Sequence, residues 1–416
     1  MQAWRTEVRG WLASALPRRS ERPEGPADYA VFQNITDEAE RDLLDKVRAY
    51  RKQRYDAGYG AIALAEELGG AGLSMRYVVA FTEEEQAFDP PQSTELISVT
   101  CGLVGPTIAT FGTAEQRAKY ARAFLRSDLL CCQLFSEPGA GSDLAAVATS
   151  AVFAEEDGWL IEGQKVWSSG ARFADYGLLL ARTDREVAKQ AGLTMFLIPM
   201  DAPGVEVRPI RQMSGASSFN EVFLSGVRVG DDMRVGAVGE GWKVANATLM
   251  SERVSIGASR AVPRDSGMIS PTLRTWRSRP ELRTPGLHDR LLRLWTEAEV
   301  ARLASERLRQ QLAAGKPGPE GSASKLVFAR LNQEISGFEV ELAGSDGLRY
   351  DDWTMRRPEH ANFFGRGPGY RYLRARGNSI EGGTSEILRN IIAERVLGLP
   401  SEPRVDKDVP WKDLPK

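Results

Sequence analysis

The sequence predicts a mostly helical protein with one small antiparallel β domain in its middle. Apolar residues recur at helical spacing up to about residue 130, and short strand-like runs replace them as far as about residue 232. Helical spacing then returns from Gly241. We therefore expect an N-terminal helical domain over 1–131, a β domain over 132–236, C-terminal helices over 237–400 and a tail over 401–416.

The N-terminal part shows the clearest helical signals. Thr36 is placed to cap a helix that extends to Ala57, with apolar residues along one face. The first twenty residues contain several charges and only a short apolar run, which favours a docked amphipathic helix over an export signal. We expect the acidic run Glu83–Glu85 to form a solvated face of another helix.

In the later segments, turn residues mark the boundaries of the predicted strands and helices. Asp157-Gly158 stands between two β-rich runs, which is typical of a hairpin. Long helices are predicted up to Gly315 and over 322–343, and the last helix begins near Ser385. The tail is expected to be extended or disordered.

Composition excludes several classes of protein. The 416 residues include 54 Lys+Arg and 56 Asp+Glu, and this balanced charge argues against non-specific nucleic-acid binding. No apolar run approaches the roughly 20 residues that span a bilayer, so we expect no membrane segment. Three cysteines do not make a disulfide framework, and we expect a reducing, cytoplasmic location.

The catalytic options are correspondingly narrow. Two histidines nearly exclude a multi-histidine metal site, and we expect no metal. Neither a G-x-S-x-G nucleophile elbow nor a G-x-x-x-x-G-K-[ST] phosphate loop is present. Chemistry must come from carboxylates, hydroxyls, backbone amides or a bound cofactor.

Two clusters of unusual residues flank the start of the β domain. In FSEPGAGSD (135–143), proline and glycines force a tight backbone, and the hydroxyls of Ser136 and Ser142 are suited to an anion or a polar ring edge. In GQKVWSSG (163–170), Trp167 is suited to stand against a flat cofactor with Ser169 at its edge. A plain loop and a strand with a core tryptophan are the simpler interpretations.

Two further clusters lie in the C-terminal helices. In SIEGGTSEI (379–387), the glycine pair lets the backbone approach a ligand, and the following helix start favours a negative group. An ordinary capped helix is the simpler interpretation. In LMSERV (249–254), Glu252 is either a base or a surface ion-pair residue.

In order, spacing and element type, LFSEPGAGSDLA, GWLIEGQKVWSSG and IEGGTSEILRNIIAERVLGLP resemble the acyl-CoA dehydrogenase family over about residues 1–400. The resemblance implies an N-terminal helical domain, an antiparallel, barrel-like middle domain and a C-terminal four-helix bundle. It also implies non-covalent FAD and α,β-dehydrogenation of an acyl-CoA, in which a carboxylate takes the α-proton and the β-hydride passes to flavin N5.

The resemblance assigns roles to single residues. Ser136 and Ser169 would lie near the flavin ring, Ser142 near the diphosphate, and Trp167 against the flavin. The other implied contacts are a backbone amide at Gly382 for the thioester carbonyl and cofactor positions at Gln133, Gly141, Thr384 and Glu386.

The sequence departs from the usual family pattern at the base. The common Y-E-G-T form has its catalytic glutamate two residues before the threonine, and that position is Gly382 here, which leaves Glu381 one residue out of step. Isovaleryl-CoA and long-chain members instead carry the base on the first helix after the β domain, where Glu252 matches. We expect Glu252 to be the base, with Glu381 as the alternative, and a branched or bulky acyl group as substrate.

Two motifs that reach the FAD of a neighbouring subunit are also altered. R-x-x-F-G is replaced by SPTLRTWRSRPELR, in which Arg277 or Arg279 is the candidate substitute. Q-x-x-G-G-x-G is replaced by ELAGSDG from Glu341 to Gly347. The resemblance implies an electron-transfer flavoprotein as electron acceptor, and either a homodimer or homotetramer or a heterotetramer with a related subunit. Alternatives are a carrier-protein-bound substrate, flavin oxidase or monooxygenase chemistry, and a non-catalytic partner subunit.

Overall fold

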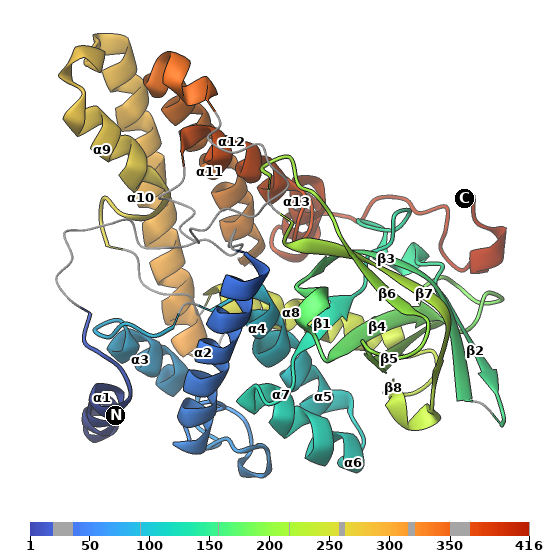
Figure 1. Cartoon of the computed structure of the whole chain (residues 1–416). Coiled ribbons are helices and arrows are strands. Elements are labelled where there is room, and N and C mark those ends of the chain that lie inside the picture. Colours follow the sequence, from blue (N-terminus) through green and yellow to red (C-terminus); the bar gives the residue numbers. More distant parts are fainter. Residues whose placement is uncertain are drawn as a thin grey trace.

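Helices, one sheet and further helices follow one another along the chain, as the sequence predicts (Figure 1). The computed structural model describes residues 1–19, 36–91, 93–156, 158–215, 217–257, 263–314, 321–349 and 367–415. Figure 1 shows the sheet at the right, the N-terminal helices below it to the left, and the long helices α10 and α11 rising at the upper left. No helix in this described part has both the length and the apolar character needed to cross a membrane.

Local capping sets the N-terminal helices. Thr36 caps its helix by accepting a hydrogen bond from the Ala39 amide at 3.1 Å, and Thr113 forms a capping box with Gln116. The start at Thr36 agrees with the sequence pattern. The elements are α1 (Gln2–Ala15), α2 (Asp37–Asp56), α3 (Met75–Glu85), α4 (Glu95–Val99), the π turn η2 (Thr100–Val104), α5 (Gly105–Phe111), α6 (Ala114–Gln116), the π turn η3 (Arg117–Ala121) and α7 (Arg122–Arg126).

The acidic run on α3 is not a solvated face, and this expectation was wrong. Glu84 pairs with Arg5 at 2.7 Å and also with Arg9, both on α1, while Glu85 accepts a hydrogen bond from the Tyr50 hydroxyl at 2.5 Å. The apolar face of α1 buries Val8 and Leu12 in the same seam, so α1 is docked as predicted. A charge run indicates a solvated face only when no basic helix packs across it.

The middle of the chain forms one open sheet with strand order β6-β7-β3-β2-β4-β5-β8, and β1 pairs with β4. The predicted hairpin joins β2 to β3 in antiparallel register. One detail differs from the expected antiparallel barrel: the sheet path is open, and β4 runs parallel to β1 and to the start of β2. The strands are β1 (Cys131–Leu134), β2 (Ser150–Ala154), β3 (Gly158–Ser169), β4 (Tyr176–Arg182), β5 (Leu193–Pro199), β6 (Val205–Pro209), β7 (Phe219–Val229) and β8 (Arg234–Val235).

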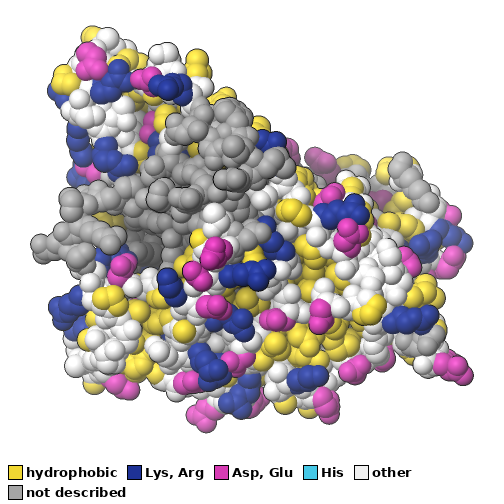
Figure 2. Space-filling model, viewed as in Figure 1, with side chains coloured by type: hydrophobic (Ala, Val, Ile, Leu, Met, Phe, Trp, Pro, Cys, Tyr) yellow, Lys and Arg dark blue, Asp and Glu magenta, His cyan; other side chains and the backbone are white. Residues whose placement is uncertain are grey.

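Central strand β4 is buried on both faces, because Leu178, Leu179, Leu180 and Ala181 are all inaccessible. A parallel pairing of this kind is normally covered on both sides. The core of the sheet is continuous with that of the N-terminal helices, so the two parts share one apolar interior. Basic and acidic side chains are interspersed over the face shown in Figure 2.

The C-terminal helices pack around α11, which contacts α8, α10 and α13. This agrees with the expected helical bundle, whose separate core includes Leu331, Ile335 and Phe338. The helices are α8 (Gly241–Gly257), α9 (Ser270–Ser278), α10 (Pro285–Ala313), α11 (Gly321–Ala343), α12 (Pro368–Ala375) and α13 (Ser385–Arg395).

Short 3-10 turns link the main elements. They are η1 (Glu66–Leu68), η4 (Leu144–Ala146), η5 (Ala171–Phe173), η6 (Asp231–Met233), η7 (Gly267–Ile269), η8 (Pro280–Leu282), η9 (Gly344–Leu348), η10 (Arg376–Ser379) and η11 (Trp411–Asp413). The last of these turns belongs to the tail, which was expected to be extended or disordered. It lies against the β domain instead, through a β-bridge between Pro410 and Ala188.

Candidate functional site

The first candidate loop, residues 135–143, leaves the sheet directly after β1 and is tied down by a buried ion pair. The Glu137 carboxylate lies 2.8 Å from the ammonium of Lys165, which is fully buried on β3. The Lys165 ammonium also donates to the carbonyl oxygens of Phe135 at 3.0 Å and Leu180 at 2.7 Å. One cation therefore joins the loop to strands β3 and β4.

Glu137 closes the other side of this arrangement. Its carboxylate accepts hydrogen bonds from the backbone amides of Ala148 at 2.6 Å and Thr149 at 2.9 Å. Burial alone would raise the pKa of Glu137, but Lys165 and these amides outweigh it and hold the pKa below its usual value. Burial lowers the pKa of Lys165 to about 8. The pair is a structural anchor beneath the loop.

The loop itself presents its small polar residues outward. A tight turn pairs the backbone of Glu137 with that of Ala140 in both directions, at 3.1 and 3.0 Å. Gly141 and Ser142 are exposed, and a Cβ atom built at Gly141 meets nothing within 4 Å. The Ser136 carbonyl accepts a hydrogen bond from the Val166 amide at 2.9 Å. Amides and hydroxyls are thus offered to solvent from a rigid base, which suits an anionic group.

The second segment contains a β-bulge at Trp167. Lys165 pairs with Val222 and Ser168 with Asn220, so two residues of β3 oppose one residue of β7. Bulges commonly re-aim a side chain next to an active site. Trp167 has φ of +64° and is 57% exposed, with the edge of its ring system against Phe219.

A bulky non-glycine residue in this backbone region is strained, and such strain is stored mainly at functional sites. Solvent exposure varies along this segment: Trp167 is exposed, Ser168 is buried and Ser169 is half-buried. Because the Val166 amide joins this segment to Ser136, the structure brings Ser136, Trp167 and Ser169 into one neighbourhood. Gln133 lies on the adjoining strand β1, half-buried and opposite Leu178.

The second candidate loop, residues 379–384, precedes α13 and depends on glycine. Gly382 and Gly383 have φ of +61° and +90°, which L-residues with side chains rarely adopt. The ammonium of Lys325 on α11 donates to the carbonyls of Asn378 at 2.7 Å and Gly383 at 2.8 Å. Thr384 caps α13 by accepting from the Ile387 amide at 3.2 Å. The loop is therefore held open toward solvent by one neighbouring helix.

The two glutamates of this region have local partners. The Glu381 carboxylate accepts hydrogen bonds from the Arg374 guanidinium at 3.0 Å and from the Asn378 amide at 2.7 Å. Glu386 is exposed in the first turn of α13 and pairs with Arg389 at 3.3 Å. The carboxylate of Glu381 is thus committed to a cation and a donor on the same stretch of chain.

Glu252 lies in α8, where its backbone position is described and its side chain is not. α8 begins at Gly241, where a Cβ atom would come within 2.6 Å of the Thr194 amide nitrogen on β5. One turn before Glu252, the hydroxyl of buried Thr248 lies 2.9 Å from that of Thr107 on α5. α8 as a whole contacts α5 in the N-terminal part, β5 in the sheet, and α10 and α11 in the C-terminal part.

The residues that were to replace the altered inter-subunit motifs have partners nearby. Arg277 pairs with Asp265 at 3.3 Å, Arg279 pairs with Glu281 at 2.8 Å, and Glu341 pairs with Arg290 on α10. These contacts are exposed ion pairs of the kind that contributes little to stability. Nothing in them brings an arginine toward the two candidate loops.

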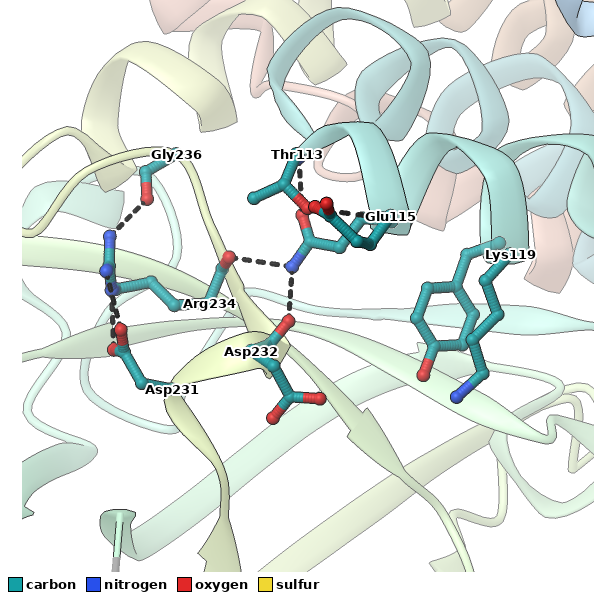
Figure 3. Close-up of a pocket in the computed structure, with 9 residues that line it drawn as sticks. Thr113, Glu115, Lys119, Asp231, Asp232, Arg234 and Gly236 are labelled. Carbon is teal, nitrogen blue, oxygen red and sulfur yellow. Dashed lines mark hydrogen bonds and ion pairs between the residues drawn. The ribbon is translucent and has the colours of Figure 1, made fainter.

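A separate hollow of about 410 Å³ lies between α6, η3 and the η6–β8 segment (Figure 3). Gln116 crosses it and donates to the carbonyls of Asp232 at 2.6 Å and Arg234 at 2.8 Å, while Arg234 pairs with Asp231 at 2.8 Å. None of the sequence-predicted site residues lines this hollow. Its groups join the helices to the sheet.

Sequence reasoning missed the lysines that position both loops. Lys165 follows Trp159, Ile161 and Gly163 at every second residue, so the alternation of β3 does place it on the inward face. That signal could have identified a buried cation. Lys325 has no comparable signal, because its carbonyl partners lie more than fifty residues away in the chain.

Comparisons with known proteins agree with this architecture. The family models described as the N-terminal, middle and C-terminal domains of acyl-CoA dehydrogenase match residues 30–128, 132–227 and 239–397. Acyl-CoA dehydrogenase IpdE1 of Mycobacterium tuberculosis is 35% identical over 411 residues, which cover 97% of this chain and 98% of the relative. The short-chain specific mitochondrial enzyme of Homo sapiens is 29% identical, covering 88% of this chain and 89% of its own.

Solved structures show the same fold. The structure described as the Tcur3481-Tcur3483 steroid ACAD is 26% identical, with a TM-score of 0.71 over 96% of this chain and 98% of that chain. The ChsE4-ChsE5 complex from Mycobacterium tuberculosis is 26% identical, with a TM-score of 0.69 and the same coverage. The chain therefore belongs to the acyl-CoA dehydrogenase family, whose members are FAD-dependent oxidoreductases.

Proposed function

We propose that this protein oxidises a bulky acyl-CoA thioester between its α and β carbons, with Glu252 as the base and a related subunit as its partner. The observation that carries the proposal is the strained, exposed Trp167, which a β-bulge presents beside Ser136 and Ser169. An exposed indole on a strained backbone has little structural purpose, whereas a flat ring system would cover it.

The residues present fit FAD. Trp167, Ser136 and Ser169 would hold the flavin, while Gly141 and Ser142 offer amides and a hydroxyl to the diphosphate; Gln133, Thr384 and Glu386 are proposed as further contacts. When bound, FAD supplies the acceptor for the β-hydrogen, which leaves as hydride. Electrons would leave through an electron-transfer flavoprotein.

The second loop supplies the donor that the chemistry needs. Loss of an α-proton places negative charge on the thioester oxygen, and a preorganised amide stabilises that charge. The left-handed backbone at Gly382 and Gly383, fixed by Lys325, makes an exposed amide available without crowding from a side chain. We assign this role to the Gly382 amide.

The choice of base rests on the partners of Glu381. A general base must reach the proton that it removes, and the Glu381 carboxylate is instead engaged by hydrogen bonds from Arg374 and Asn378. Glu252 lies one helical turn beyond buried Thr248, on a helix that all three parts of the chain surround. These contacts favour Glu252 over Glu381.

The relatives support the proposed substrate class and partner. One solved relative is described as a steroid ACAD and another as a two-chain complex, and each covers nearly the whole chain. The local pairing of Arg277, Arg279 and Glu341 agrees with a cofactor site completed by a different subunit. A branched or polycyclic acyl group also suits the base position on α8.

An absorbance spectrum followed by anaerobic titration tests the proposal. The protein, alone and co-purified with a related subunit, would be mixed with straight-chain, branched and steroid-side-chain acyl-CoA thioesters. We expect a yellow protein whose flavin band bleaches with the bulky thioesters. A yellow protein that no thioester bleaches contradicts the activity, and bleaching by short straight chains alone contradicts the substrate class.

A further inference from the structure

The tail returns to the β domain and pairs with it through its backbone. The Trp411 amide donates to the Val187 carbonyl at 2.8 Å, and the Lys412 amide donates to the Arg185 carbonyl at 3.1 Å. These bonds extend the bridge between Pro410 and Ala188. Residues 404–414 are called the tail clasp below. In Figure 1 the chain runs from α13 to the right, and the tail clasp lies beside the sheet near the C-terminal label.

Trp411 reaches the turn η4, which directly follows the first loop. Its indole N–H donates to the carbonyl of Ala146 in η4 at 3.3 Å, and the Arg182 guanidinium lies 4.5 Å from its ring centre. Arg182 is 1% exposed and donates to the carbonyls of Ala145 at 2.6 Å and Val147 at 2.9 Å. The tryptophan and the arginine thus hold the same turn from two sides.

A chain of alternating charges makes the second connection. The Lys189 ammonium lies 2.6 Å from Asp143, the last residue of the first loop, and 2.5 Å from Asp406 in the clasp. Asp406 is also paired with Arg404 at 2.8 Å. Hydrogen bonds from Arg404 and Lys189 hold the pKa of Asp406 well below its usual value. Lys189 is buried, so its two carboxylate neighbours are kept in one geometry.

We propose that the tail clasp positions the first loop for the FAD diphosphate, with Trp411 as the main positioning residue. This proposal rests on the proposed function, since it assigns Gly141 and Ser142 to the diphosphate. Glu137 and Lys165 anchor the start of the loop, but its end is held by Arg182, Lys189 and the clasp. A loop that is loose at its end must be ordered when the cofactor binds, which weakens binding.

Two variants test the clasp: Trp411→Ala and a deletion of residues 404–416. The deletion removes Asp406, the second partner of Lys189, together with its own partner Arg404, so this ion pair is lost as a neutral unit. We expect FAD to bind about tenfold more weakly in both, and amide hydrogen exchange at 140–147 to accelerate. Trp411→Phe keeps a ring against Arg182 and should restore most of the affinity.

Val405→Ala is the matched control, because Val405 lies in the clasp and is 95% exposed. It should change neither FAD affinity nor hydrogen exchange. If the tail variants lower only the melting temperature, with exchange at 140–147 and FAD affinity unchanged, the clasp is merely structural and the proposal is overturned. Hydrogen exchange needs no cofactor, so wild-type protein that never binds FAD would contradict the proposed function while the exchange result still decides the clasp.

Discussion

The two glycine-bearing loops of the proposed site are built in opposite ways. The first loop, residues 135–143, rests on the fully buried Lys165 and its partner Glu137, and its last residue, Asp143, shares Lys189 with Asp406 of the tail. The second loop, residues 379–384, is held by a hydrogen bond from the half-buried Lys325 and by the helix cap at Thr384. A loop that binds a large cofactor must be rigidly supported. A loop that presents one backbone amide needs mainly the correct backbone angles.

The largest expected effect tests whether the catalytic base is Glu252 on α8, which lies outside both loops. Glu252→Gln should reduce turnover by about 10³-fold, because a positioned general base contributes roughly 10²–10⁴. FAD content, read from the flavin absorbance, should stay unchanged. Rates are to be measured by anaerobic single-turnover bleaching with the best thioester.

Glu381→Gln is the matched control on the second loop. It should lower the rate far less than Glu252→Gln, since its carboxylate serves Arg374 and Asn378. The opposite order of the two variants would place the base on the second loop and reverse the assignment.

The first loop should be the more sensitive to loss of its lysine. Lys165→Met leaves Glu137 buried without a cation, and breaking one side of a buried pair destabilises a protein by about 3–5 kcal/mol. Urea unfolding would measure the change. The double variant Lys165→Met/Glu137→Gln should recover part of the stability, and a double variant no more stable than the single one would refute the pairing argument.

The second loop should respond to its lysine through catalysis instead. Lys325→Met removes two bonds to backbone carbonyls, and the misplaced amide should lower kcat by roughly tenfold to a hundredfold with FAD affinity unchanged. Lys243→Met is a suitable control, because Lys243 is exposed and pairs only within its own helix turn in the described structure. Loss of FAD in the Lys325 variant would contradict the view that the first loop serves cofactor binding and the second loop serves catalysis.

A pH dependence of stability is also expected, and it belongs to the first loop. Burial lowers the pKa of Lys165 from 10.5 to about 8, so between these values the unfolded chain binds more protons than the folded chain. The free energy of unfolding should therefore gain a positive slope as pH rises from about 8 to about 10.5. Lys165→Met should lack this contribution, and identical slopes in both proteins would contradict it.

Local signals explain what could be predicted. Thr36, Thr113 and Thr384 each cap a helix through an amide three residues ahead, and the glycine pair in IEGGT already requires a left-handed backbone. Such interactions are complete within a few residues, so the pattern of residue types is enough to read them. The order of helices and strands follows in the same way from periodicity.

The partners of charged residues could not be read locally. The acidic run on α3 has the composition of a solvated face, yet Arg5 and Arg9 reach it from a helix more than seventy residues earlier. The parallel pairing of β1 with β4 likewise depends on a crossover that encloses the whole β2–β3 hairpin. Neither arrangement leaves a trace in the neighbouring sequence.

By itself, the sequence determined the succession of helices and sheet, the helix caps, the glycine turns and the family motifs, because each of these is set by neighbours along the chain. Tertiary structure alone decided that Lys165 is buried, that Glu381 is held by Arg374, and that the tail docks beside the first loop. Packing brings together segments that are far apart in sequence, and only then do desolvation and long-range pairing choose which charges anchor the site and which remain for chemistry.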